Sequence, residues 1–384
     1  MSGNIKERLR HLEFPQSTRA ALDHLVRCYA DTGGGIPGLG GGTENLADEV
    51  VQDYILNLSR KRPGQRNLTA VQELQLLELL CSCLQDAPEM FCYSIFSIIF
   101  GGQVDSHKTG LLTKLVSLAI SVGCGAVLGC AALWMQELGS QSQAVCDLAQ
   151  KLVDDYCLLF PNVSMTFQHL PSVSPLFTCN FITAVTTIYT MLDRSRIPPV
   201  GLVEYITEWV SSDPCLCSES VRLIRIRSNF TCPLYGLVRW CVIGPLLCKD
   251  QYQISIPNGA DAEVESHEKM LSLLSKLHIS VLLSLQAYKS MELNQELFMY
   301  GDIYLLAKII ATHYQNSNFK CDEDSQLQVS LDRLGQTIQV AMITGSLNGQ
   351  FDLRPVFEIL PPNRLLHIVA KRQAVIKREA MDIS

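Results

Sequence analysis

The sequence of 384 residues lacks the residue patterns on which most enzymes and metal sites depend. It contains no Cys-x-x-Cys pair, no His-Glu-x-x-His motif, and no two histidines within four residues of each other. A metal site needs several ligands whose spacing lets them converge on one ion, and a nucleophilic cysteine or serine needs an oriented base. We therefore predict a protein without catalytic residues, metal ions or cofactors.

Two Cys-x-Cys pairs come closest to a metal motif. Cys81 and Cys83 fall in a predicted helix, where side chains two positions apart point about 200° away from each other and cannot hold one ion together. Cys215 and Cys217 follow an Asp-Pro dipeptide in a predicted loop and are freer to converge, but two ligands do not complete a site. Neither pair changes the expectation.

Asp154 and Asp155 are adjacent carboxylates within one strongly helical segment. General acid–base pairs need carboxylates opposed across a cleft, not neighbours on one helix. We therefore interpret them as a surface pair; the alternative is that Asp154 bonds to the end of a neighbouring helix. His278 lies beside an apolar stripe, and we expect a packing histidine rather than a ligand.

Charged residues are also scarce, at 18% of the chain against 47% hydrophobic residues. This composition is typical of a chain with a large core, not of a disordered one. The formal net charge of −7 argues against a nucleic-acid binder, whose footprint is a basic patch or a basic domain. We expect no strong direct binding to nucleic acid.

The N-terminal residues MSGNIKERLRHLEF have no apolar core of a signal peptide. The 15 cysteines are an odd number, and most fall on the apolar faces of predicted helices. Free buried cysteine behaves as a small hydrophobic residue, and disulfides are rare in the cytosol and nucleus. These features favour a reducing compartment.

One segment raises the alternative of a membrane protein. Residues Leu115 to Gln136 carry no charge and are long enough to cross a bilayer, and a GxxxG spacing begins at Gly125. However, Gly123 and Gly125 bracket a predicted break, which would leave two buried helices of ordinary length at Thr109–Val122 and Ala126–Leu138. We therefore expect no direct contact with a membrane.

Apolar residues recur at steps of three and four along most of the chain, which is the period of an α-helix. Successive helical pairs are spaced at roughly 35–45 residues, the scale of HEAT and armadillo repeats, and they share no consensus. The sequence predicts an all-α fold, an irregular α-helical repeat array. Its expected parts are an N-terminal array over residues 1–248 with a flexible glycine-rich loop at 32–43, a polar loop at 249–269, and a smaller C-terminal helical part over 270–384.

Two apolar stripes dominate the C-terminal part, from Met270 to Tyr288 and from Leu327 to Ala341. We expect both to pack in the core; the alternative is a groove for a partner helix.

In the N-terminal part, Thr69 and Gln72 have the spacing of a capping box at the start of a helix.

The segment VRLIRIRSNF, from Val221 to Phe230, alternates apolar and basic residues like an extended strand. We predict that Arg222, Arg225 and Arg227 contact an acidic surface of a partner protein, because arginine makes directional, bidentate contacts with carboxylates. The alternative is a solvated edge without a partner.

Seven of the helical segments, taken in order, are specific in a way that each alone is not. They read VQELQLLELLCSCLQ, LLTKLVSLA, LAQKLVDDYCLLFP, SPLFTCNFITAVTTIY followed by IPPVGLVEYITEWVSSDP, LYGLVRWCVIGPL, SKLHISVL and VSLDRLGQTIQVAMITGSL. This series, from about residue 68 to residue 347, resembles the family of subunit 15 of the Integrator complex. The glycine-rich residues 32–43 and the segment 249–269 do not match the family.

The resemblance implies a non-enzymatic nuclear scaffold with an α-helical repeat fold. It implies partnership with Integrator subunits 10, 13 and 14 and a link between their module and the core of the complex. Integrator cleaves small nuclear RNA and other RNA polymerase II transcripts and attenuates transcription, with its endonuclease and phosphatase in other subunits. The residues by themselves equally allow a cytosolic helical-repeat adaptor.

Overall fold

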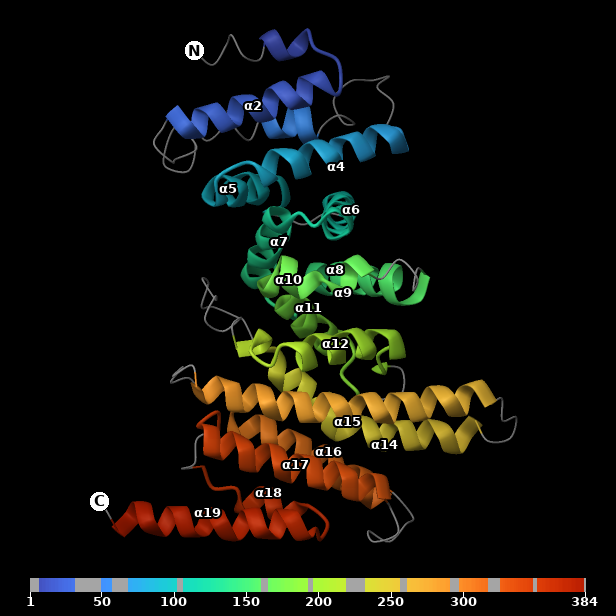
Figure 1. The fold of residues 1–384 in the computed structure, drawn as a ribbon, viewed down its shortest axis with the longest axis vertical. Helices are drawn as coiled ribbons and strands as arrows, with labels where there is room; N and C mark the ends of the chain where they lie inside the picture. The colour runs from blue at the N-terminus through green and yellow to red at the C-terminus, as the bar shows by residue number, and fades with distance from the viewer. Residues whose placement is uncertain are drawn as a thin grey trace. The chain divides into compact units, whose positions relative to one another are not determined.

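The computed structural model describes residues 7–31, 50–56, 68–101, 106–159, 165–192, 196–218, 232–255, 261–290, 297–316, 325–347 and 351–382. Within these ranges the regular structure is helical, with one isolated bridge between Phe298 and Leu347 (Figure 1). The predicted all-α class is confirmed. The glycine-rich loop expected at residues 32–43 lies outside the described ranges.

The chain divides into two compact units, the first formed by residues 1–152 and 165–177 and the second by residues 153–164 and 178–384. The helices of the first unit are α2 (Gln16–Asp31), η1 (Gln52–Leu56), α4 (Ala70–Gln85), α5 (Glu89–Phe100), α6 (Ser106–Val122), α7 (Gly125–Leu138), α8 (Gln143–Val153), α9 (Met165–Gln168) and α10 (Leu170–Val173).

The start of α4 is fixed by the predicted capping box. The backbone N–H of Gln72 donates to Thr69 Oγ1 at 3.3 Å, and the backbone N–H of Thr69 donates to Gln72 Oε1 at 3.0 Å. Two N–H groups that a helix start leaves unpaired are thereby satisfied. The prediction is confirmed.

The uncharged stretch from Leu115 to Gln136 forms two helices, as predicted. Helix α6 ends at Val122, Gly123 has a positive φ of 71°, and α7 begins at Gly125. A residue with a Cβ rarely adopts that backbone conformation. Nine of the 14 residues of α7 are buried, and the helix packs against α4, α5 and α6, so it belongs to the core of the first unit.

The second unit contains η2 (Asp154–Leu159), most of α11 (Pro175–Ile188), α12 (Val200–Ser212), α14 (Pro233–Ser255), α15 (Asp261–Ser290), α16 (Tyr300–Asn316), α17 (Ser325–Thr344), α18 (Arg354–Ile359) and α19 (Arg364–Asp382). Its centre is made by α14, α15 and α17, which pack against one another (Figure 1).

Both predicted C-terminal stripes are buried in this centre. The first belongs to α15 and the second to α17, and the members of both are fully or almost fully buried: Met270, Leu274, Leu277, Val281, Leu285, Tyr288, Leu327, Leu331, Leu334, Ile338 and Ala341. Core packing is therefore confirmed for these two faces, and a partner groove there is excluded.

The polar loop predicted at residues 249–269 is wrong in extent. Helix α14 continues to Ser255 and α15 begins at Asp261, so most of the expected loop is helical (Figure 1). Glutamate, lysine and glutamine are good helix formers, and polar residues extend a helix readily beyond its packed part. The division into parts at 1–248 and 270–384 stays a prediction.

Among the described residues, one helical stretch, Glu265–Lys289 in α15, is long and apolar enough by composition to cross a membrane. It is not the stretch that the sequence singled out. Its apolar stripe packs against α12, α14 and α17, and its Lys269 and Lys276 form ion pairs with Glu204 and Glu208 of α12, with N–O distances of 2.7 and 3.3 Å. This is the packing of a core helix.

Candidate interaction surfaces

The three arginines predicted to bind a partner, Arg222, Arg225 and Arg227, fall within residues 219–231, outside the described ranges. Their role stays a prediction. The less generic segments RWC, LVDDYC and IPP…W…DP lie within the described ranges, and their contacts can be examined.

The dipeptide Arg239-Trp240 of α14 fastens that helix to the C-terminal end of α11. The Arg239 guanidinium donates to the Thr186 carbonyl, and Trp240 Nε1 donates to the Tyr189 carbonyl at 2.6 Å. The last carbonyls of a helix have no donor within the helix, and a cation is favourable at that end. Burial lowers the pKa of Arg239, but an arginine stays protonated in a protein.

Two glycines of α14 permit its close approach to neighbouring helices. A Cβ added at Gly236 would overlap the Thr186 hydroxyl of α11, and one added at Gly244 would lie 2.6 Å from Leu274 Cδ1 of α15. Larger residues at these positions would push α14 away. The segment LYGLVRWCVIGPL therefore specifies helix packing.

The LVDDYC and IPP…W…DP segments also serve the packing of the second unit. Helix α12 contacts η2, where Gly201 faces the Cys157 carbonyl. Trp209 is buried edge-on against Phe181, with ring centroids 6.3 Å apart. Asp213 Oδ1 accepts the backbone N–H of Cys215 at 2.9 Å and closes the turn after α12. These segments build the core.

The two carboxylates of that region, Asp154 and Asp155, lie in η2 and are half-buried rather than fully solvated. They are neighbours on one helical turn, as the sequence indicated, and not an opposed pair across a cleft.

Arg333 is a buried cation whose role follows from a proline elsewhere in the chain. Pro245 lies inside α14 and has no N–H, so the Cys241 carbonyl, four residues earlier, loses its helical donor. Arg333 Nη1 donates to this carbonyl at 2.8 Å, and Nη2 donates to Ser275 Oγ at 2.6 Å. One side chain of α17 thus links α14 and α15.

His278 is a packing histidine, as predicted. Its side chain is 4% exposed, and Nε2 lies 3.4 Å from the Thr337 hydroxyl. Burial lowers the pKa of the imidazole to about 4, and the positive charge of Arg333 contributes in the same direction. The ring is therefore neutral at physiological pH.

The described cysteines are free thiols, and eight are buried: Cys81, Cys92, Cys124, Cys130, Cys179, Cys217, Cys241 and Cys248. Burial raises the pKa of Cys92, Cys130, Cys241 and Cys248, to about 12 for Cys241, which disfavours the reactive thiolate. Within the described ranges no three His, Cys, Asp or Glu side chains are grouped so as to hold a metal ion.

Two of the surface recesses formed by the described residues lie between packed helices. One, of about 460 Å³, lies between α2 and α4 in the first unit and has charged walls that include Arg19, Asp23 and Glu78. The other, of about 320 Å³, lies between α17 and α19 in the second unit and is mainly apolar. We call the second the α17/α19 recess; it is lined by Gln339, Met342, Ile343, Ile368, Val369 and Arg372.

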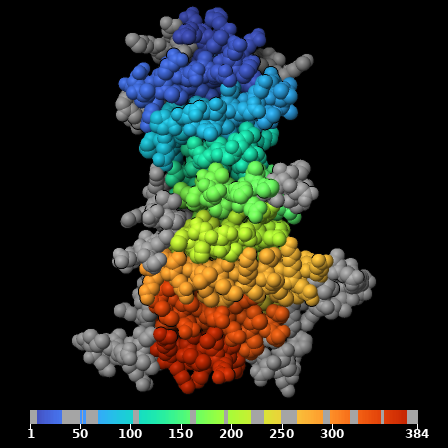
Figure 2. Space-filling model, viewed as in Figure 1, coloured from blue at the N-terminus to red at the C-terminus, as the bar shows by residue number. Residues whose placement is uncertain are grey.

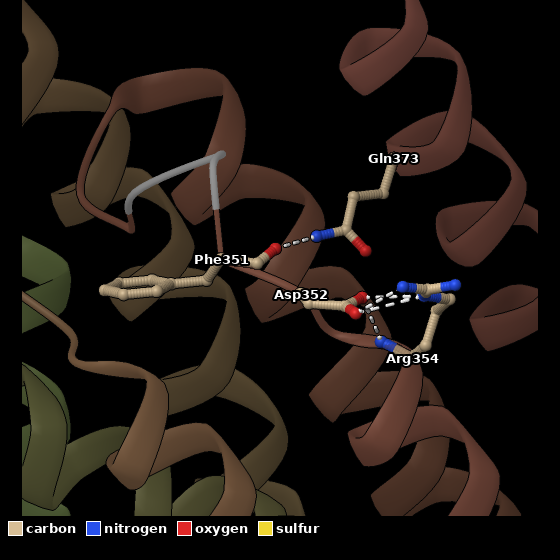
Figure 3. A network of polar contacts seen from close by, with 4 residues as sticks. All are labelled: Phe351, Asp352, Arg354 and Gln373. Carbon is tan, nitrogen blue, oxygen red and sulfur yellow. Dashed lines mark hydrogen bonds and ion pairs between the residues drawn. The ribbon is translucent and has the colours of Figure 1, made fainter.

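Two sets of polar contacts hold α19 against the rest of the second unit. At its start, Asn363 Oδ1 accepts the backbone N–H of Leu366, while Asn363 Nδ2 donates to Gln328 and Asp332 of α17 at 2.9 and 2.8 Å. Further along, the buried Gln373 donates to the Phe351 carbonyl at 2.5 Å (Figure 3).

A second contact in the same view joins Asp352, which precedes α18, to Arg354 at the start of α18. Asp352 and Arg354 form an exposed, bidentate ion pair, with Arg354 Nη2 2.7 Å from Asp352 Oδ2 (Figure 3). Gly335 of α17 lets Leu365 and Leu366 of α19 approach closely.

Helices α17 and α19 therefore form a packed pair, adjacent on the surface of the second unit (Figure 2).

The comparisons with known proteins cover most of these packed helices, and the family match ends before α19 begins. A profile of the family described as Integrator complex subunit 15 matches residues 3–362. A protein of this name from Homo sapiens is 35% identical over 348 residues, with 84% of this chain and 76% of the relative covered. The relative from Danio rerio is 34% identical over 348 residues, with 85% and 72% covered.

A relative from Drosophila melanogaster with the same name is 29% identical over 346 residues, with 85% of this chain and 87% of the relative covered. These proteins are named as subunits of a complex and not as enzymes. The resemblance of the seven helical segments is confirmed, and the chain belongs to the Integrator complex subunit 15 family.

Proposed function

We propose that this chain is a non-catalytic scaffold subunit of Integrator in the nucleus. In this role it links the module of subunits 10, 13 and 14 to the rest of the complex, and so serves 3′-end processing of small nuclear RNA and attenuation of RNA polymerase II transcription. The observation that carries the proposal is the family match over residues 3–362. Its distinctive residues, such as Arg239 and Arg333, act on helix packing, which suits a scaffold.

We further propose that the helices form an irregular HEAT- or armadillo-like array. Supporting this, the main packing partners of helices α12 to α19 lie one to three helices away in chain order, as α15 and α17 do for α14. Contacts of this kind are typical of repeat proteins. Small-angle scattering tests the array: a radius of gyration well above the roughly 21 Å of a compact chain of this length is expected, and a value near it would contradict the proposal.

Affinity purification of the tagged chain from nuclear extract tests the scaffold role. Subunits 10, 13 and 14 should be recovered together with the Integrator core, and removal of this chain should separate the module from the core. Recovery of none of these subunits would contradict the proposal. Exclusion of the tagged chain from the nucleus would favour the alternative, a cytosolic helical-repeat adaptor.

A further inference from the structure

The α17/α19 recess exposes apolar side chains that a packed surface normally covers. Ile343 of α17 is 48% exposed and Ile368 of α19 is 52% exposed, and both line the recess. Ile279 and Leu283 of α15 are exposed to a similar degree but line neither of the two recesses. The α17/α19 recess therefore combines exposed apolar atoms with a concave shape, which is what an anchoring side chain of a partner requires.

The two walls of the recess differ in charge. The α17 wall is neutral, because residues 335–344 contain no charged side chain. On α19, by contrast, the recess is lined by Ile368, Val369 and the exposed Arg372. The exposed Arg364 and Lys371 lie outside the recess on the adjoining basic face, and residues 364–373 contain no acidic side chain. This basic face belongs to a chain whose formal net charge is −7. Its charge complements an acidic partner.

The recess is also preformed. Helix α19 is held against the second unit by Asn363 at its start and by Gln373 ten residues later, and Gly335 sets its close packing on α17. A partner would not have to order these helices, so less of the binding free energy would be lost on association.

We propose that the α17/α19 recess binds an amphipathic, acidic helix of another Integrator subunit. The apolar face of that helix would cover Ile343 and Ile368, and its carboxylates would pair with Lys371 and Arg372 at the rim. This is the helix-in-groove mode of recognition. The proposal rests on the proposed function, since it places the partner within the Integrator assembly.

A protein helix fits these features better than an anionic membrane or a nucleic acid. Membrane-surface helices present their apolar residues on a convex face, whereas Ile343 and Ile368 border a recess between two helices. Binding of single-stranded nucleic acid relies on aromatic stacking, and none of the residues that line the recess is aromatic. Both remain outcomes of the test.

The test compares four forms of the tagged chain in affinity purification from nuclear extract. They are the wild type, Ile343→Ser/Ile368→Ser, Lys371→Glu/Arg372→Glu, and the control Ile279→Ser/Leu283→Ser, which removes an equally exposed apolar pair from α15. Both recess variants should lose one Integrator subunit by about tenfold or more, the change expected from about 1.4 kcal/mol of binding free energy. The control should retain it.

Photo-crosslinking then identifies the partner segment and its charged residues. A photo-crosslinking amino acid at position 368 should label an acidic helical segment of the lost subunit, and exchanging two of its carboxylates for lysines should restore binding to Lys371→Glu/Arg372→Glu. Thermal unfolding checks that each variant is folded. If a double variant is unfolded, Arg372→Glu alone serves in its place, because this exposed change leaves the apolar floor intact.

Failures of the two proposals are distinguishable. If the wild type recovers no Integrator subunit, the proposed function is wrong. If the wild type recovers them and both recess variants retain them all, only the recess proposal is wrong. Crosslinks to a second copy of this chain, or to RNA, would also overturn it. So would sedimentation of the wild type with vesicles of phosphatidylcholine and phosphatidylserine that Lys371→Glu/Arg372→Glu abolishes.

Discussion

At the scale of single residues, Arg333 of α17 supplies a hydrogen-bond donor that α14 lacks. Pro245 leaves the Cys241 carbonyl without a donor in α14, and the guanidinium supplies one from α17. A buried carbonyl without a donor costs about 1–3 kcal/mol. The stabilising effect of Arg333 therefore depends on the presence of Pro245, although 88 positions separate the two residues in the sequence (333 minus 245).

This dependence can be measured by a double-mutant cycle. Arg333→Met should lower the free energy of unfolding by about 1–3 kcal/mol, because the carbonyl is left unpaired. In the Pro245→Ala background the alanine N–H can bond to the carbonyl, so the same change should cost about 1 kcal/mol less. Denaturant unfolding gives both values. The exposed Arg354→Met serves as the control, and equal costs in the two backgrounds would refute the link.

His278 should make stability depend on pH in a defined window. Its folded pKa of about 4 is below the ordinary histidine pKa of 6.5, so the unfolded chain binds the proton more tightly. Stability from this group is therefore complete above pH 6.5 and falls as the pH is lowered towards 4, by on the order of 2–3 kcal/mol. The difference between wild type and His278→Gln across pH 4–7 isolates this effect from the carboxylates. A difference independent of pH would contradict it.

A further prediction concerns the three arginines that lie outside the described ranges. Charge reversal of Arg222, Arg225 and Arg227 to glutamate should weaken recovery of Integrator subunits without lowering the temperature of thermal unfolding. The physical reason is that bidentate contacts with acidic side chains would become repulsive. An unchanged pull-down would leave a solvated edge as the correct interpretation.

At the scale of elements, close approach between helices is set by a few glycines. Gly236 of α14 lies against Thr186 of α11, beside the contacts made by Arg239 and Trp240. A methyl group here cannot be accommodated without moving α14, and with it the two hydrogen bonds that cap α11.

Gly236→Ala should therefore destabilise the protein by about 1–3 kcal/mol, the usual cost of overpacking. Gly110→Ala in α6 is the matched control, because nothing lies within 4 Å of a Cβ built there; it should stabilise by about 0.5–1 kcal/mol through helix propensity alone. Thermal or denaturant unfolding of the two variants distinguishes the cases. Similar effects of both changes would show that α14 tolerates the methyl group.

At the scale of the whole molecule, the segments that resemble the Integrator family contain both packing residues and exposed ones. The segment VSLDRLGQTIQVAMITGSL holds the buried Arg333 and the exposed Ile343, whereas Ile368 lies beyond the residues 3–362 that the family profile matches. Within these segments, Arg239, Trp240, Gly201 and Arg333 hold helices together. Partner contacts are then expected on side chains that the fold leaves uncovered, such as Ile343 and Ile368. A scaffold needs both sets, a rigid frame and exposed anchors.

Much of the fold follows from local patterns in the sequence. The period of apolar residues predicted the all-α class and the buried stripes of α15 and α17, the Thr69–Gln72 spacing predicted a helix start, and Gly123 predicted the break between α6 and α7. These features depend on residues within a few turns of one another. The 249–269 loop was predicted incorrectly because its polar residues are compatible with both a loop and a solvated helix end.

Other features were decided only by tertiary structure, because they join residues far apart in the chain. The bond from Arg333 to the Cys241 carbonyl spans 92 positions, and that from Trp240 to the Tyr189 carbonyl spans 51. The recess depends on how α17 and α19 lie together, although the exposed face of α19 could have been read from its basic and apolar residues at helical spacing. The sequence by itself determined the helices and their family. Packing decided which residues are buried and which remain free to bind, since burial is a property of the assembled helices and not of any one of them.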